Sequence, residues 1–187
     1  MTFVIDTRPL GYDGQPLHCE RAATVVLVGC GGTGSFLADA ICRLLIGRAA
    51  RVFLVDPDRV EPRNVSRQAF DRREVGRFKA EALAERLTRR YGREIGYAVD
   101  PYDRALHGGI FAEGPPSALD LLAGAVDNAA ARRAFAATLD GRDLVGGWGG
   151  ASRRVWLLDC GNERNNGQVL LGNAMRPEEL RGAFLTG

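Results

Sequence analysis

The sequence predicts an α/β protein with a doubly wound, mostly parallel sheet. Three observations support this fold class. The length of 187 residues suits a single domain, 1–187, with a full hydrophobic core. Short apolar runs typical of strands alternate with segments whose apolar residues have helical spacing. A glycine-rich turn stands where the first apolar run meets the first helical segment. Such alternation favours a parallel sheet, because parallel strands need a crossover connection that is usually a helix.

The first strand, turn and helix are predicted by the run Thr24–Val28, the turn Gly29-Cys-Gly-Gly-Thr-Gly34 and a helical pattern over Thr33–Ile46. A second apolar run, Arg51–Val55, ends at Asp56, 22 residues after the last glycine of the turn. Glycines allow the backbone to approach a phosphate, the helix N-terminus presents free N–H groups, and the acid can accept hydrogen bonds from ribose hydroxyls. This order predicts a Rossmann-like nucleotide-binding βαβ unit.

Later elements follow the same alternation. Pro57 and Pro62 favour an extended segment after the second strand. We then expect a helix over Lys79–Tyr91, strands at Glu94–Val99 and Leu119–Val126, a helix over Ala129–Leu139, and short strands at Val155–Leu158 and Gln168–Leu171. Residues 1–23 are expected to be an irregular lead-in, and 101–117 and 146–150 to be loops, because they are rich in glycine and proline.

Composition restricts the class of protein. No apolar stretch reaches transmembrane length and the N-terminus has no leader-like segment, so we expect a cytoplasmic protein without a membrane partner. The 4 cysteines form no C-x-x-C pair, which argues against zinc or redox sites. A net charge of +2 does not favour nucleic acid as a partner. The locally basic stretch Arg59–Arg93 is interpreted as a solvated helix face, with a surface for an acidic protein or polyanion as the alternative.

Residues that suit ATP chemistry occur in order along the chain. An adenylation site needs a phosphate cradle, an acid for the ribose, cations near the triphosphate and a carboxylate for Mg²⁺. Lys79 is the only lysine among the 25 basic residues, and its compact ammonium suits phosphate oxygens. Asp127 follows a predicted strand, at the edge of the sheet where ligands bind in open α/β folds. The candidates for such a site are therefore the glycine turn, Asp56, Arg67, Lys79 and Asp127.

Each candidate also has a purely structural interpretation. Asp56 could cap the turn before Pro57, and Asp127 could be the N-cap of helix 129–139. Asn64 and Gln68 could satisfy the backbone of their own loop. Arg67 could be an ordinary surface residue, and the single lysine could stand where it does by chance. The functional hypothesis depends on these residues meeting at one edge of the sheet.

Taken together, these motifs resemble the ThiF/E1 superfamily, the adenylating enzymes that activate ubiquitin-like proteins and sulfur carriers. The resemblance covers about residues 24–172 and is carried by Gly29–Ser35, Val55–Asn64, Arg67-Gln68, Val75-Gly76, Lys79-Ala80, and Val126-Asp127-Asn128 with Arg132. Asp159-Cys-Gly-Asn162 and Gly167-Gln-Val169 further resemble the ThiF-related member of the PRTRC cassette, a bacterial gene cluster.

The resemblance implies ATP and Mg²⁺ as ligands and assigns roles to residues. It implies nucleotide binding by Gly29, Gly31, Gly32, Gly34, Asp56, Asp58, Asn64, Arg67, Gln68 and Lys79. Arg67, Lys79 and Asp127 are the implied catalytic residues, with Asp127 as the Mg²⁺ ligand. It also implies a homodimer in which one subunit lends an arginine to the other, with Arg8 as the candidate donor.

The function predicted on this basis is ATP-dependent adenylation of a carboxylate, the C-terminus of a ubiquitin-like or sulfur-carrier-like protein. One alternative is an NAD(P)-dependent oxidoreductase, which explains the glycine turn and Asp56 but not Arg67, Lys79 or Asp127. Another is a non-catalytic nucleotide-binding scaffold. Many family members have two zinc-binding C-x-x-C pairs and a downstream catalytic cysteine. This sequence has neither, so we expect a truncated member or a fragment, and a structural role for Cys160.

Overall fold

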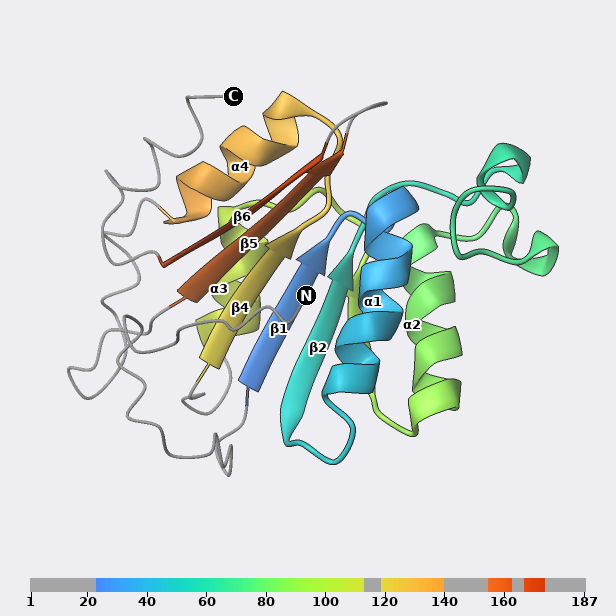
Figure 1. Ribbon diagram of the computed structural model, residues 1–187, viewed down its shortest axis with the longest axis horizontal. Helices are drawn as coiled ribbons and strands as arrows, with labels where there is room; N and C mark the ends of the chain where they lie inside the picture. The colour runs from blue at the N-terminus through green and yellow to red at the C-terminus, as the bar shows by residue number, and fades with distance from the viewer. Residues whose placement is uncertain (1–22, 113–118, 140–154, 163–166, 174–187) are drawn as a thin grey trace, which may run out of the picture.

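The computed structural model describes residues 23–112, 119–139, 155–162 and 167–173. A 6-stranded sheet of order β3-β2-β1-β4-β5-β6 forms its centre, with helices on both faces (Figure 1). The elements are β1 (Ala23–Val28), α1 (Gly32–Leu44), β2 (Ala50–Val55), the 3-10 turns η2 (Pro62–Asn64) and η3 (Arg72–Glu74), α2 (Lys79–Tyr91), β3 (Ile95–Ala98), α3 (Arg104–Ala112), β4 (Leu119–Gly124), α4 (Ala129–Leu139), β5 (Val155–Asn162) and β6 (Gly167–Asn173).

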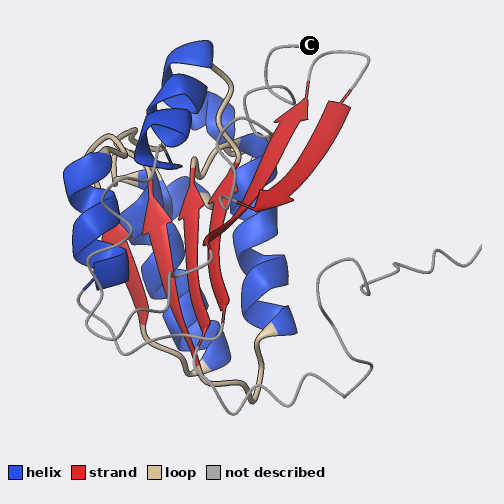
Figure 2. Cartoon of the chain, turned by 90° about the vertical axis from the view of Figure 1, so that its left-hand side faces the viewer, coloured by secondary structure: helices blue, strands red, loops and turns tan. Residues whose placement is uncertain are grey.

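The pairing of the strands confirms the predicted fold class. β1 pairs in parallel with β2 and with β4, β2 pairs in parallel with β3, and β4 pairs in parallel with β5. Only the β5–β6 pair in the described sheet is antiparallel, and Figure 2 shows this hairpin at one side of the sheet. Because parallel strands end at the same edge, the carboxyl ends of β2, β1 and β4 lie side by side.

Strand β1 is buried along its whole length, because both faces of the sheet are covered. Val25 and Leu27 face one apolar cluster, which includes Leu83 and Leu87 of α2. Val26 and Val28 face a second cluster, which contains Ile110 and Phe111 of α3. This two-sided core fixes the end of β1, and with it the start of the glycine turn.

One predicted loop is wrong, because residues 104–112 form helix α3. Gly108 and Gly109 led to that expectation, since each glycine costs about 1 kcal/mol in a helix relative to alanine. In the structure, Leu106, Ile110 and Phe111 pack against the second apolar cluster from one side of the helix. Burial of these three side chains offsets the poor helix propensity of the two glycines.

Other element boundaries differ by a few residues from those predicted. Helix α1 ends at Leu44 rather than Ile46, and Gly47 follows with φ +71°, a conformation that suits glycine. Strand β4 ends at Gly124, and β5 extends beyond Leu158 to Asn162. The predicted loop 146–150 and almost all of the predicted lead-in lie outside the described residues. None of the described helices is long and apolar enough to span a membrane.

Candidate functional site

The glycine turn after β1 is held tightly at two positions. Gly29 has φ +90°, and its N–H donates to the carbonyl of Val55 at 2.8 Å. A Cβ added to Gly29 would lie 2.6 Å from the carbonyl oxygen of Ala125, and one added to Gly34 would overlap the carbonyl of Gly29. These two glycines are therefore required for packing between β1, β4 and α1, whatever the turn binds.

The middle of the same turn is open. A Cβ added to Gly32 would meet nothing within 4 Å, and one added to Gly31 would meet only the Gln68 amide nitrogen at 4.0 Å. Helix α1 begins at Gly32; in the described structure no side chain caps its N-terminus, and its first turn contains no acid. The first N–H groups of a helix have no partner within the helix and attract anions. The turn thus provides an open place for a phosphate at a helix N-terminus.

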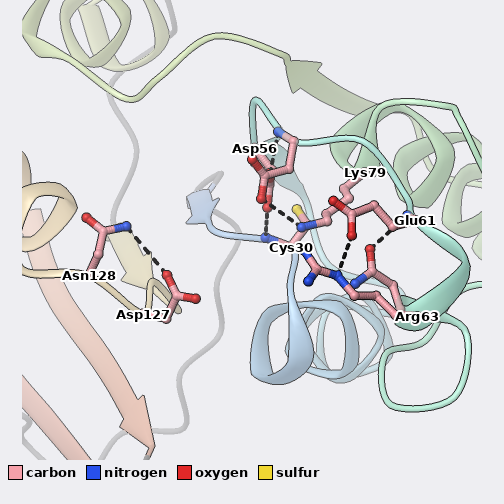
Figure 3. Close-up of polar contacts among 9 residues, drawn as sticks. Cys30, Asp56, Glu61, Arg63, Lys79, Asp127 and Asn128 are labelled. Atoms are coloured by element: carbon pink, nitrogen blue, oxygen red, sulfur yellow. Dashed lines mark hydrogen bonds and ion pairs between the residues drawn. The ribbon is translucent and has the colours of Figure 1, made fainter.

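Asp56 links this turn to the segment after β2. Its side chain is buried, and Oδ2 accepts from the Cys30 N–H at 2.6 Å (Figure 3). Oδ1 accepts from the Asp58 N–H at 2.8 Å. Burial raises the pKa of Asp56, while the two N–H donors and the charge of Lys79 act in the opposite direction. The structural alternative for Asp56 is thus confirmed as one role, and its contact with a ribose stays a prediction.

Lys79 is not an ordinary surface residue. It is the first residue of α2, its side chain is only 9% exposed, and its Nζ lies 2.8 Å from Asp58 Oδ2. The Lys79 N–H also donates to the carbonyl of Asp58 at 2.9 Å. The Asp58 side chain is 68% exposed, so water screens one partner of this pair and not the other. The ammonium is thereby held on the segment that Asp56 ties to the glycine turn.

The three remaining residues predicted on this side have different positions. Asn64 is buried, and its Oδ1 accepts from the Glu61 N–H at 2.9 Å, so it supports its own loop. Gln68 is buried near Gly31, and its Oε1 has no hydrogen-bond partner in the described structure. Arg67 is exposed. The structure therefore brings Gln68 to the glycine turn, while phosphate contacts by Asn64 and Arg67 stay predictions.

Asp127 lies beyond β4, on the other side of the glycine turn. Figure 3 shows it apart from Asp56 and Lys79. Asn128 Oδ1 accepts from the Ala131 N–H at 2.8 Å, so Asn128 is the N-cap of α4. The alternative in which Asp127 caps this helix is therefore wrong. Asp127 is exposed, and the contact of its carboxylate within the described residues is a long one, 3.5 Å, with the Asn128 amide nitrogen.

An ion pair behind Asp127 was not predicted as part of the site. Arg132 Nε lies 3.1 Å from Asp159 Oδ2, and Asp159 is only 2% exposed. The sequence feature that could have indicated it is the position of Asp159, directly after the apolar run Val155–Leu158. The next residue, Cys160, is half-buried; burial and the charge of Asp159 raise the pKa of its thiol. A raised pKa disfavours the reactive thiolate, which supports a structural role for Cys160.

Asp127 fits a magnesium ion that is bound jointly by a carboxylate and by the phosphates of a nucleotide, rather than one bound by protein side chains alone. Within the described residues, no three His, Cys, Asp or Glu side chains come close enough together to hold a metal. Mg²⁺ retains several waters and is usually bound by one or two carboxylates together with substrate phosphates. The exposed carboxylate of Asp127 suits that arrangement, because its contact with Asn128 among the described residues is long and easily exchanged.

Fold and site together define a doubly wound α/β domain with an open glycine turn and a helix N-terminus at its carboxyl edge. Residues 7–152 match the ThiF family model, and the chain belongs to the ThiF family. Ubiquitin-like modifier-activating enzyme 5 from Xenopus laevis is 36% identical over 127 residues, 62% of this chain and 30% of that protein. The same enzyme from Aedes aegypti is 35% identical over 125 residues, again 62% of this chain and 30% of the relative.

Solved structures show the same architecture. E. coli tRNA N6-threonylcarbamoyladenosine dehydratase, TcdA, in complex with ATP has a TM-score of 0.51 and 27% identity, covering 71% of this chain and 51% of that chain. A complex of TcdA with AMP matches with the same TM-score of 0.51. PaaA, with a TM-score of 0.53 and 20% identity over 76% of this chain and 38% of that one, supports the fold alone. This chain therefore spans only part of the proteins that it matches.

Proposed function

We propose that this domain binds ATP at the carboxyl ends of β2, β1 and β4 and adenylates a carboxylate, the C-terminus of a ubiquitin-like or sulfur-carrier-like protein. One observation carries the proposal: the open turn at Gly32 follows β1, between the segment after β2, where Asp58 holds Lys79, and the segment after β4, which carries Asp127. The ATP complex of TcdA, at 27% identity, supports ATP as the nucleotide.

In the proposed reaction a carboxylate oxygen attacks the α-phosphorus of ATP. The bond from that phosphorus to the oxygen bridging to the β-phosphate breaks, and pyrophosphate leaves with the electron pair. The product is an acyl adenylate. No general base is required, because the attacking carboxylate is already ionised. The N–H groups of α1 and the cations Lys79 and Arg67 stabilise the charge on the phosphates.

Three carboxylates prepare this chemistry, Asp56 and Asp58 after β2 and Asp127 after β4. Asp58, whose side chain is largely exposed, holds Lys79 until phosphate oxygens replace it as the partner. Asp127 would hold Mg²⁺, which neutralises charge on phosphate oxygens when it is bound. Asp56 keeps the turn and the Lys79 segment in register through its two N–H contacts.

Pyrophosphate exchange tests the proposal. With ATP, Mg²⁺ and small proteins ending in Gly-Gly, labelled pyrophosphate should enter ATP only when a competent carboxylate is present. The matched control is the same small protein lacking its two terminal glycines. ATP binding without exchange for any partner encoded nearby would favour a nucleotide-binding scaffold and contradict adenylation.

Three further assignments belong to the same proposal. We propose a homodimer on the basis of the family; Arg8, the candidate donor of a cation to the partner's site, lies outside the described residues. A monomer by light scattering that is also fully active in pyrophosphate exchange would exclude the homodimer. The specific relationship to the PRTRC member rests on Asp159–Asn162 and Gly167–Val169. A cytoplasmic location completes the proposal.

A further inference from the structure

An ion pair with a buried carboxylate lies next to the loop that carries Asp127. Asp159 of β5 stands opposite Gly124, the last residue of β4, in the parallel register of the two strands. Its Oδ2 lies 3.1 Å from Arg132 Nε of α4. The carboxylate is almost completely removed from water, so it depends on this guanidinium for its charge.

The same guanidinium reaches the loop itself. Arg132 Nη2 donates to the carbonyl of Val126 at 3.2 Å, one residue before Asp127. Ala125 donates its N–H to Val28 at 2.8 Å, and the Asn128 side chain caps α4. The loop from 125 to 128 is thus fixed at the three residues around Asp127, which leaves that carboxylate exposed at a defined place.

We propose that Arg132 and Asp159 are positioning residues that set the place of Asp127 for a divalent cation bound together with a nucleotide. This inference rests on the proposed function. A planar guanidinium can bond a carboxylate with one N–H and a carbonyl with another, which a lysine ammonium cannot do with the same fixed geometry. Asp159 orients the Arg132 guanidinium, and the guanidinium in turn holds the carbonyl of Val126. Groups that bond directly to a metal ligand change metal affinity by about 10–100-fold when they are removed, so a pair that acts on the residue next to the ligand should lie at the lower end of that range.

The test measures metal binding and backbone protection, neither of which requires turnover. Mn²⁺ binding is followed by electron paramagnetic resonance with a non-hydrolysable ATP analogue present, and hydrogen exchange is followed over residues 122–133 without ligand. Asp159→Asn and Arg132→Lys should each weaken Mn²⁺ binding about 10-fold. Both should also speed exchange over this segment. Binding of the nucleotide without metal should be unchanged.

A matched control breaks a comparable pair elsewhere. Glu74 of η3 is also buried and lies 2.7 Å from Arg86 of α2, so neither residue belongs to the loop that carries Asp127. Glu74→Gln should leave Mn²⁺ binding unchanged. Because a lone buried charge can prevent folding, the double variant Arg132→Met with Asp159→Leu gives a folded alternative with an apolar contact in place of the pair. It too should bind Mn²⁺ about 10-fold more weakly than the parent.

The outcomes separate the two proposals. A parent that binds Mn²⁺ with the nucleotide, together with folded variants that bind it equally well, would overturn the positioning role alone. Weakening in Glu74→Gln as large as that in Asp159→Asn would overturn it as well, because the effect would be a general loss of stability. A parent that binds no Mn²⁺ with the ATP analogue would overturn the proposed function, and this role for the pair with it.

Discussion

The ends of β2 and β4 flank the same glycine turn but are built in opposite ways. After β2, Asp56, Asn64 and the Lys79 side chain are buried and already bonded within the protein. After β4, the functional candidate Asp127 is exposed, and it is the neighbouring residues that are bonded. After β2, the charged side chains are themselves bonded within the protein. After β4, the bonds of the neighbouring residues leave the Asp127 carboxylate available to a ligand.

This difference suggests a division of labour. The β2 side is preorganised, which suits a role in positioning phosphates at little cost when the ligand arrives. The β4 side is completed by what it binds, which suits a carboxylate that shares a cation with a substrate. Changes on the β2 side should therefore alter nucleotide chemistry and packing, whereas changes at Asp127 should alter metal dependence alone.

The largest expected effect comes from Lys79→Ala. If the ammonium passes from Asp58 to the reacting phosphates, its loss should lower pyrophosphate exchange by about 100–1,000-fold, with a smaller effect on ATP affinity. Folding should be little affected, because the carboxylate left behind on Asp58 is largely exposed to water.

Arg77→Ala provides the matched control. Arg77 lies two residues before Lys79, and its guanidinium lies 2.8 Å from Glu85 on the surface. Surface pairs contribute little, so this variant should exchange pyrophosphate like the parent. Equal losses in the two variants, measured at saturating ATP, would assign the Lys79 effect to general charge rather than to its position.

The glycine turn offers a second, intermediate effect that separates packing from binding. Gly34→Ala introduces a Cβ against the Gly29 carbonyl and should lower the free energy of unfolding by about 1–3 kcal/mol. Gly32→Ala places its methyl group in open space, so it should fold at least as well as the parent. Its methyl group would still obstruct a phosphate at the turn. Denaturant unfolding and ATP titration of both variants check the pair; unchanged ATP affinity in Gly32→Ala would argue against a phosphate at this turn.

The smallest expected effects come from variants after β4 and test whether Asn128 has a structural role and Asp127 a functional one. Asn128→Ala removes the N-cap of α4 and should cost about 1 kcal/mol of stability. Asp127→Ala removes an exposed side chain, so stability should change by no more than about 0.5 kcal/mol. The order should reverse for function: Asp127→Ala, which removes the proposed ligand itself, should raise the Mg²⁺ concentration needed for half-maximal exchange far more than Asn128→Ala, which loosens only one contact of its loop. A stability loss in Asp127→Ala larger than that in Asn128→Ala would contradict this assignment.

The elements with clear periodicity could be predicted from sequence alone. Helix α2 and helix α4 begin and end where the apolar spacing placed them, and the βαβ unit follows from its glycine turn and Asp56. Helix α3 could not be predicted, because its stability comes from burial against the sheet rather than from local propensity. The N-cap of α4 could not be assigned from sequence either. Asp127 and Asn128 are both good N-cap residues, and only the structure shows that Asn128 caps the helix.

The most direct measurement is a calorimetric titration of the protein with Mg²⁺-ATP and, separately, with NAD. The glycine turn and Asp56 suit either ligand, but Lys79 and Asp127 are explained by a triphosphate with its cation. Binding of Mg²⁺-ATP that is clearly tighter than binding of NAD, and weaker when Mg²⁺ is removed, is the predicted result. Tighter binding of NAD would contradict the account and favour an oxidoreductase.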